Sequence, residues 1–147
     1  MNLDRCSVCP VPECLFCSAV AGSVSVVPVF SSPVVFAFLD HRPVFKGHVL
    51  VVTRAHLADL ADLPEPDVGP YFLDVRRIAV AVETGLGAAG TFVAINNKVS
   101  QSVPHLHTHV VPRTKGDGLR GFFWPRTKYD SPEEAASYAT RISAALP

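Results

Sequence analysis

The stretch Gln101-Ser-Val-Pro-His105-Leu-His107-Thr-His109-Val-Val-Pro-Arg113 carries a histidine at every second position between residues 105 and 109. Because successive side chains of a β-strand point to opposite faces, an extended chain would line one face with three imidazoles. Leu106 and Val110 would then pack on the other face. A helix would scatter the same imidazoles around its circumference, so the spacing predicts a strand. Three of the chain's six histidines lie here, which argues against a set of unrelated core residues.

Two kinds of chemistry suit such a strand. In one, the imidazoles bind a metal, since neutral histidine is the commonest zinc ligand. In the other, one imidazole is a nucleophile while its neighbours bind phosphate or move protons. The flanks favour the second interpretation, because no carboxylate lies between Thr91 and Lys115 to complete a hydrolytic metal site. Neutral amides and hydroxyls that suit phosphate oxygens are present instead: Asn96, Asn97, Gln101 and Ser102.

The stretch resembles the signature of the histidine triad family of nucleotide hydrolases and transferases, in which His-x-His-x-His is followed by two apolar residues. Three upstream elements extend the resemblance in the same order: Cys14-Leu-Phe-Cys17, Phe38-Leu-Asp40-His-Arg-Pro43 and Gly47-His-Val-Leu-Val-Val-Thr-Arg-Ala-His56. The cysteine element is similar to that of the zinc-containing, bacterial-type branch. Four ordered matches make the resemblance far more specific than one short motif.

The resemblance implies nucleotidyl transfer through a covalent intermediate. His107 would attack the α-phosphorus of a nucleoside phosphate ester, anhydride or phosphoramidate, and water or another acceptor would then release the nucleoside monophosphate. His109 is the second expected catalytic residue, and the expected ligand is a purine nucleotide or its conjugate. The implied substrate contacts are Asp40 on the ribose hydroxyls, and Asn97, Gln101, Ser102 and His109 on the phosphate. A simpler interpretation of Asp40 is a residue that initiates a turn.

The same resemblance implies a structural zinc ion. Four protein ligands would close the site and leave no coordination position for substrate. The matching residues are Cys14, Cys17, His56 and His105. From the residues alone, paired Cys-x-x-Cys motifs also suit redox chemistry or spare thiols. Cys6 and Cys9 have no counterpart in the family pattern.

Two alternative functions remain open at this stage. The first is a zinc-dependent hydrolase that uses His105, His107 and His109 as an exposed metal site. Chelation would abolish its activity, and no covalent nucleotide would form. The second is a nucleotide-binding protein without catalysis, in which removing His107 would change affinity only.

Composition bounds the class of protein. A chain of 147 residues with 48% hydrophobic residues suits one globular domain over 1–147, with a cysteine-rich, zinc-binding segment at 1–23 and a C-terminal tail at 114–147. Thirteen basic and thirteen acidic residues give no excess charge for an extended nucleic acid. No run approaches the roughly 18 apolar residues of a membrane span, and the first twenty residues lack an apolar signal-peptide core. We therefore expect a cytoplasmic protein that binds no membrane.

Local patterns predict an α+β fold. Strands are expected at 34–40, 48–53 and 91–97, in addition to the histidine strand. A long amphipathic helix is expected after Asp67, its proposed cap, following a link that holds Pro64, Pro66 and Pro70 and ending at Gly85 and Gly87. Ser131 would cap a short helix ending near Ala145. Together these predict an antiparallel sheet of about five strands, one long helix and one short one.

Four finer expectations follow. The strand 91–97 should pair with the histidine strand as a hairpin, which would bring Asn97 beside His107 and His109. The intervening loop 98–101 lacks the glycines customary in the family. His48, at a strand start, is expected to have a structural hydrogen-bonding role, and Trp124 to tune substrate choice. Family resemblance also implies a homodimer with a continuous sheet.

Overall fold

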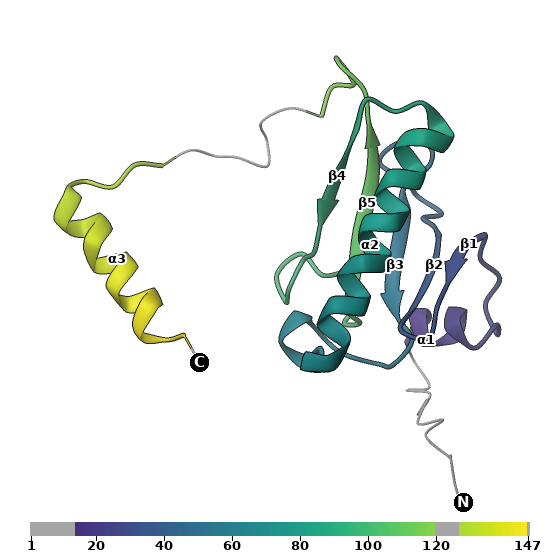
Figure 1. Cartoon of the computed structure of the whole chain (residues 1–147), viewed down its shortest axis with the longest axis horizontal. Coiled ribbons are helices and arrows are strands. Elements are labelled where there is room, and N and C mark those ends of the chain that lie inside the picture. Colours follow the sequence, from purple (N-terminus) through teal and green to yellow (C-terminus); the bar gives the residue numbers. More distant parts are fainter. Residues whose placement is uncertain (1–13, 120–126, 147) are drawn as a thin grey trace, which may run out of the picture. The chain divides into compact units, whose positions relative to one another are not determined.

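The structure is a computed structural model that describes residues 14–119 and 127–146. The chain divides into two compact units, residues 1–115 and 116–147. The first contains the sheet, and the second contains helix α3, Pro132–Ala144 (Figure 1). The predicted residues Cys6, Cys9 and Trp124 lie outside the described ranges, and the single domain over 1–147 stays a prediction. Within the described ranges, no helix combines the length and apolar character needed to cross a bilayer.

Five antiparallel strands form one sheet in the order β1-β2-β3-β5-β4. This arrangement confirms the predicted α+β class. The strands are β1 Pro28–Ser31, β2 Val35–Leu39, β3 Val49–Thr53, β4 Gly90–Ala94 and β5 His107–Arg113. The predicted hairpin of β4 and β5 is confirmed as well, since the two strands pair along their length.

The register of the sheet sorts the side chains onto two faces. His107 lies opposite Val52, His109 opposite Leu50, and Leu50 opposite Phe38. Because directly paired residues share a face, the imidazoles and the aromatic rings gather on one side, which we call the histidine face. The other side is aliphatic and carries Val35, Ala37, Val49, Val51 and Val110.

Helix α2, Glu65–Leu86, covers the aliphatic face (Figure 1). Its buried residues recur at helical spacing and pack against the valines of the sheet: Tyr71, Val75, Ile78 and Val82. The hydroxyl of Tyr71 donates to the carbonyl oxygen of Val51 at 3.2 Å and shares a 2.8 Å hydrogen bond with Oγ1 of Thr108. This helix and sheet form the main hydrophobic core.

Helix α2 begins earlier than the sequence predicted. Its N-cap is Pro64, and Asp67 lies in the first turn, so Asp67 as the cap is wrong. The sequence prediction assigned Pro66 to a link before the helix. Pro66 is tolerated in the first turn because the first amides of a helix have no intrahelical partner. Gly87 ends the helix in a left-handed conformation, as expected, whereas Gly85 lies inside it.

The histidine face is covered by α1, Leu15–Val20, which the sequence did not predict. Six residues cannot form a stable helix alone. Phe16, Cys17 and Ala19 are buried against Phe38, Leu50 and Val52 of the sheet, and this packing stabilises the helix.

Several strand boundaries differ from the predictions, whereas the C-terminal helix agrees. β2 spans Val35–Leu39 instead of 34–40, and β4 begins at Gly90 instead of 91. β3 begins at Val49 and β4 ends at Ala94. β5 begins at His107, because the amide of Leu106 donates to Leu57 O at 2.6 Å and Leu106 O accepts from Thr53 N at 3.2 Å, outside the strand ladder. Helix α3 is capped by Ser131, whose hydroxyl accepts from Glu134 N at 3.1 Å, and ends at Ala144 as expected.

Candidate active site and metal cluster

His107 begins β5 and presents one nitrogen for chemistry. Its Nδ1–H donates to the carbonyl oxygen of His105 at 2.6 Å, so the lone pair of the neutral ring lies on Nε2. Every fully buried polar side-chain atom in the described ranges has a hydrogen-bond partner. Nε2 of His107 makes no such bond there, so it reaches solvent although the residue is only 3% exposed. Burial lowers the pKa of His107 against the effects of its carbonyl contact and of Asp40, which favours the neutral nucleophilic form.

His109 is oriented by His48. The amide of Val44 donates to Nδ1 of His48 at 3.2 Å, so the proton of neutral His48 is on Nε2. That nitrogen lies 3.0 Å from Nδ1 of His109 and donates to it. The proton of His109 is therefore on Nε2, where it can be donated to a substrate. Burial lowers the pKa of His109 to about 4, with smaller contributions from the neighbouring His107 and His48, so the ring is neutral near pH 7.

Asp40 follows β2 on the histidine face. One carboxylate oxygen accepts from the amide of Arg42 at 2.9 Å, which is the turn-initiating role considered for this residue. The other lies 3.5 Å from Nδ1 of His48. The carboxylate is partly exposed and retains acceptor positions that a pair of ribose hydroxyls could use.

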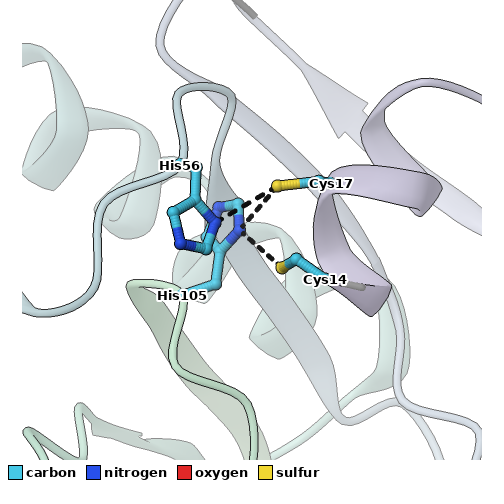
Figure 2. A group of neighbouring side chains, drawn as sticks. All are labelled: Cys14, Cys17, His56 and His105. Carbon is cyan, nitrogen blue, oxygen red and sulfur yellow. Dashed lines mark hydrogen bonds between the residues drawn. The ribbon is translucent and has the colours of Figure 1, made fainter. Parts of the chain in front are cut away.

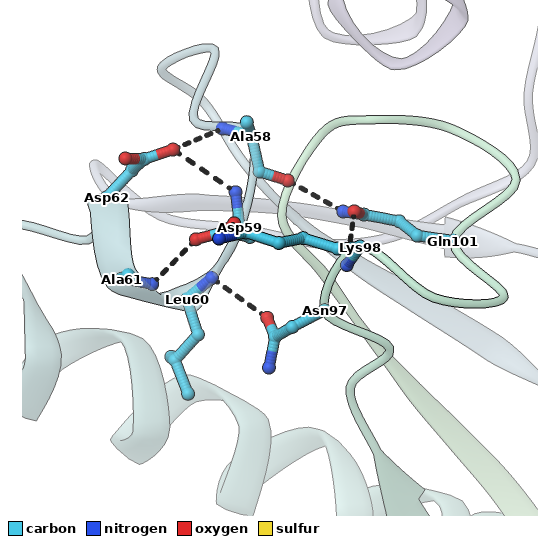
Figure 3. Close-up of polar contacts among 8 residues, drawn as sticks. All are labelled: Ala58, Asp59, Leu60, Ala61, Asp62, Asn97, Lys98 and Gln101. Carbon is cyan, nitrogen blue, oxygen red and sulfur yellow. Dashed lines mark hydrogen bonds and ion pairs between the residues drawn. The ribbon is translucent and has the colours of Figure 1, made fainter.

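The amides expected to bind phosphate hold a neighbouring segment in place (Figure 3). Oδ1 of Asn97 accepts from the amide of Leu60 at 3.0 Å. Nε2 of Gln101 donates to Ala58 O at 2.6 Å, and its Oε1 accepts from the amide of Lys98 at 3.0 Å. These bonds fix the orientation of the Asn97 and Gln101 side-chain amides, because the carbonyl oxygen of each accepts a backbone N–H. Asn97 lies beyond the end of β4 at Ala94.

The loop between β4 and β5 contains two residues in a strained backbone conformation. Lys98 and Ser100 both have a positive φ, of 67° and 59°. Side chains other than glycine rarely adopt this conformation, which typically costs about 1–3 kcal/mol. An ion pair of 3.5 Å between Lys98 Nζ and Asp59 and the hydrogen bonds of Figure 3 hold the loop in this shape. Ser102 follows the loop with an exposed side chain.

Four residues distant in sequence converge beside α1 (Figure 2). Nδ1 of His105 lies 3.4 Å from Sγ of Cys14 and 3.6 Å from Sγ of Cys17, and Nδ1 of His56 lies 3.2 Å from Sγ of Cys17. All four potential ligand atoms are within 4.8 Å of one another. These are the four metal-ligating residues that the sequence resemblance implied, and we call them the Cys2His2 cluster.

The donor set of this cluster fits zinc. Zinc bonds of about 2.3 Å to sulfur and about 2.0–2.1 Å to nitrogen set tetrahedral ligand atoms about 3.4–3.8 Å apart, close to the separations in Figure 2. Nε2–H of His105 donates to the carbonyl oxygen of Thr53 at 2.7 Å, which leaves the Nδ1 lone pair facing the sulfurs. Burial, the largest cause, lowers the pKa of His105 to about 4, so the ring is neutral as a ligand must be.

The imidazoles form a row rather than one common cluster. Ring centroids of His56 and His105 are 5.1 Å apart, and those of His107 and His109 are 4.9 Å apart. Phe16 of α1 contacts both His105 and His107, at 5.9 and 5.0 Å. Thus the ring of His105 belongs to the Cys2His2 cluster, and the rings of His107 and His109 belong to a separate site.

Comparison with known proteins identifies the family of this chain. The HIT domain family matches residues 24–116 of the chain. The chain belongs to the HIT domain family. A crystal structure of a HIT family member from Bacillus subtilis is 32% identical and superimposes with a TM-score of 0.83, covering 92% of this chain and 98% of that one.

Two further HIT relatives bear on function and metal. Adenosine 5'-monophosphoramidase of Schizosaccharomyces pombe is 30% identical over 136 residues, covering 91% of this chain and 98% of the relative. A zinc-bound histidine triad family protein from Mycobacterium smegmatis is 35% identical with a TM-score of 0.69, covering 90% of this chain and 98% of that one. These similarities support a nucleotide-related hydrolase whose Cys2His2 cluster suits zinc.

The sequence interpretation missed two residues of this HIT site. His48 was assigned a structural hydrogen bond; the bond exists, but its partner is His109, so it orients a predicted catalytic residue. Residues 48 and 50 lie on the same face of the sheet, but only the strand register, which places Leu50 opposite His109, brings His48 to that ring. Phe16 lies within the cysteine element yet contacts His107, and no local pattern indicates that contact.

Proposed function

We propose that this HIT protein is a nucleotide hydrolase or nucleotidyl transferase. Its substrates would be nucleoside phosphoramidates, dinucleoside polyphosphates or similar conjugates of a purine nucleotide. The observation that carries the proposal is the tautomer of His107, whose backbone contact through Nδ1 leaves Nε2 as a neutral nucleophile. The similarity to a relative named for adenosine 5'-monophosphoramidase activity supports the substrate class.

In the first step, the Nε2 lone pair of His107 attacks the α-phosphorus. The nitrogen–phosphorus bond forms as the bond to the leaving group breaks, which gives a nucleotidyl-histidine. The leaving group carries away the bonding electron pair and takes a proton from the solvent. In the second step water, or another acceptor, attacks the same phosphorus and loses its proton to the solvent, while the nitrogen–phosphorus bond breaks and returns the lone pair to Nε2. Imidazole suits both steps because it is nucleophilic when neutral near pH 7 and its phosphoryl adduct is labile.

His109 would stabilise the phosphoryl oxygens through its Nε2–H. The hydrogen bond from His48 supports this role, because it fixes the proton on the substrate side of the ring. Preorganised donors of this kind typically contribute about 10²–10³ in rate. Asp40 would accept from the ribose hydroxyls with the lone pairs that the amide of Arg42 leaves free.

The remaining phosphate contacts would come from the loop. An amide nitrogen carries two protons, so Nδ2 of Asn97 and the second Nε2 proton of Gln101 can still donate. The exposed hydroxyl of Ser102 completes the proposed set. Because the strained loop is anchored on residues 58–62, these donors would be held in place before substrate arrives.

The Cys2His2 cluster would hold a structural zinc ion. Its four ligands would tie α1 and the segment around His56 to the start of β5, and no coordination position would remain for substrate. The chemistry of the reaction therefore rests on the chain's own imidazoles. The zinc-bound histidine triad protein from Mycobacterium smegmatis supports the identity of the metal.

The proposal also includes a cytoplasmic homodimer built from one HIT-like domain per chain. β4 is an edge strand of the sheet, and its outer backbone groups could pair with a second copy to give a continuous sheet. Sedimentation analysis of the purified chain tests the dimer, and cell fractionation tests the location.

Rapid-quench intact mass spectrometry with adenosine and guanosine phosphoramidates tests the mechanism. We expect a transient mass increase of one nucleotidyl group and release of the nucleoside monophosphate. His107→Ala should form no adduct, whereas His41→Ala should still form it, because the His41 side chain is 76% exposed and lies 3.7 Å from Asp40, a proposed ribose contact, and not at the nucleophile. Turnover that needs a removable metal and shows no adduct would favour a zinc hydrolase instead. Nucleotide binding without turnover would reject both enzymes.

A further inference from the structure

A cavity of about 620 Å³ lies on the side of the sheet opposite the histidine face. Its walls are Leu39 and Val49 of the sheet and Ile78, Val82 and Leu86 of α2. Sites for small molecules typically enclose about 300–1,000 Å³ and have mostly apolar walls. The cavity has this size and lining, and it uses none of the residues of the proposed active site. We call it the α2 cavity.

Small residues on α2 keep the cavity open. Ala81 and Gly85 line it one helical turn apart, and a Cβ on Gly85 would meet no atom within 4 Å. Leu86 packs directly against Gly47, another lining residue, whose φ of +96° also suits glycine. Larger side chains on this part of α2 would fill the space, so the cavity depends on the local sequence of the helix.

Every charged residue that lines the cavity is a cation. These residues are Lys46 and Arg77, and no acidic residue contributes to the walls. Arg77 bonds Asp74 through Nη1 at 2.9 Å, which leaves the rest of its guanidinium free and the side chain 67% exposed. Lys46 has no ion-pair or hydrogen-bond partner within residues 14–119 and 127–146. The apolar walls therefore meet a rim that favours negative charge.

We propose that the α2 cavity binds a small amphipathic anion, namely an aliphatic or aryl carboxylate. Its apolar body would lie between α2 and the sheet, and its carboxylate would lie at Lys46 and Arg77. Such a ligand exchanges exposed apolar surface for buried contacts while its charge stays near water and two cations. This site is separate from the nucleotide site, which lies on the other face of the sheet.

The test compares octanoate with octanol, which share a chain length and differ in charge. Binding to the full chain is followed by calorimetry and by methyl NMR shifts of Ile78 and Val82. Octanoate should bind and shift these methyl groups, and octanol should bind several-fold more weakly. Absence of octanoate binding, or equal binding of both molecules, would overturn the proposal.

Two pairs of variants sharpen the test. Ala81→Phe should fill the cavity and weaken octanoate binding by about tenfold or more, whereas Val80→Phe, on an exposed part of α2, should not. Lys46→Glu should weaken octanoate about threefold to tenfold and leave octanol unchanged. Arg76→Glu makes the same change of net charge away from the cavity and should have little effect.

Sedimentation analysis separates a ligand site from a contact between copies of the chain. If Ala81→Phe changes the oligomeric state while the wild type binds no octanoate, the cavity is a protein interface and the proposal fails. If the oligomeric state is unchanged and octanoate binding is lost, the proposal stands. Neither result depends on nucleotide turnover, so the α2 cavity and the proposed enzymatic function can fail independently.

Discussion

The two faces of the sheet are covered in different ways. On the aliphatic face, α2 has 22 residues and buries a regular stripe that includes Tyr71, Val75, Ile78 and Val82. On the histidine face, α1 has six residues, and the surface it covers contains polar rings as well as aromatic ones. Packing is sufficient to hold α2 in place, whereas α1 adds two cysteines that lie within reach of distant histidines.

Because the two faces differ in this way, neighbouring residues of one strand contribute separately to stability and to the proposed chemistry. Along β5, His107 and His109 face the proposed substrate side, while Thr108 between them bonds Tyr71 in the core. Each strand residue therefore contributes mainly to one face. Substitutions on the two faces should consequently have different signatures, and the following predictions test that division.

The largest effect is expected at His107. His107→Ala should lower the rate of nucleotide release on the order of 10³-fold or more, since it removes the proposed nucleophile. Its neighbour Thr108 provides the matched control on the opposite face. Thr108→Val should reduce the free energy of unfolding and leave the rate within a few-fold. Steady-state kinetics and urea unfolding measure both; similar rate losses in the two variants would contradict the division.

Removal of metal should act next most strongly, and mainly on the histidine face. Chelation, or Cys17→Ser, should lower the free energy of unfolding by several kcal/mol, since structural zinc contributes about 10–16 kcal/mol in small peptides. Hydrogen exchange should quicken first in α1, while the amides of α2 stay protected. A zinc-free preparation with an unchanged melting curve would reject the metal assignment.

Tyr71→Phe should cost about 1–2 kcal/mol of stability, because it removes a buried hydroxyl and leaves Thr108 without that partner. The rate should stay within a few-fold of the wild type. The double variant Tyr71→Phe with Thr108→Val should lose less stability than the sum of the two single losses, since both substitutions remove the same hydrogen bond. Additive losses would show that the hydroxyls contribute separately.

The last two predictions concern pH, to which the two faces should respond at opposite ends of the scale. His109 has a pKa of about 4 in the fold and about 6.5 when unfolded. The unfolded chain therefore binds more protons between these values, so stability falls as pH is lowered from about 6.5 to about 4. Urea unfolding across this window should show a shallower slope for His109→Gln.

At alkaline pH, the change in stability should come from Tyr71 on the aliphatic face. Burial raises the pKa of Tyr71 to about 12, against a smaller opposing effect of its bond to Thr108. The unfolded chain loses this proton near pH 10, so stability should fall as pH rises from about 10 to about 12. Tyr71→Phe should remove that dependence and leave the acidic limb unchanged. A common change in both limbs would argue against independent faces.

Much of this arrangement could be predicted from the sequence. Alternation of histidines predicted that they share a face, and the family resemblance implied the convergence of Cys14, Cys17, His56 and His105. Strands β2, β3 and β4 and helix α2 followed from their apolar patterns, and helix α3 followed from its Ser131 cap. These features are encoded either locally or in motifs specific enough to identify a family.

The remaining features depend on contacts between distant segments. His48 forms a hydrogen bond with His109 because of the register between β3 and β5, and no local pattern specifies that register. Asn97 and Gln101 bond residues 58–60, a segment whose position depends on the packed fold. His105 lies before β5, because the next residue, Leu106, bonds residues 53 and 57 instead of extending the strand.

His105 connects the Cys2His2 cluster to the site of His107 and His109. Its ring lies against the cysteine sulfurs, and its carbonyl oxygen accepts the Nδ1 proton of His107. The ring and the carbonyl group are attached to the same Cα, so a rotation of the His105 backbone that moves the ring also moves the carbonyl oxygen. A shift of the His105 ring at the Cys2His2 cluster would therefore also move the carbonyl oxygen that fixes the tautomer of His107.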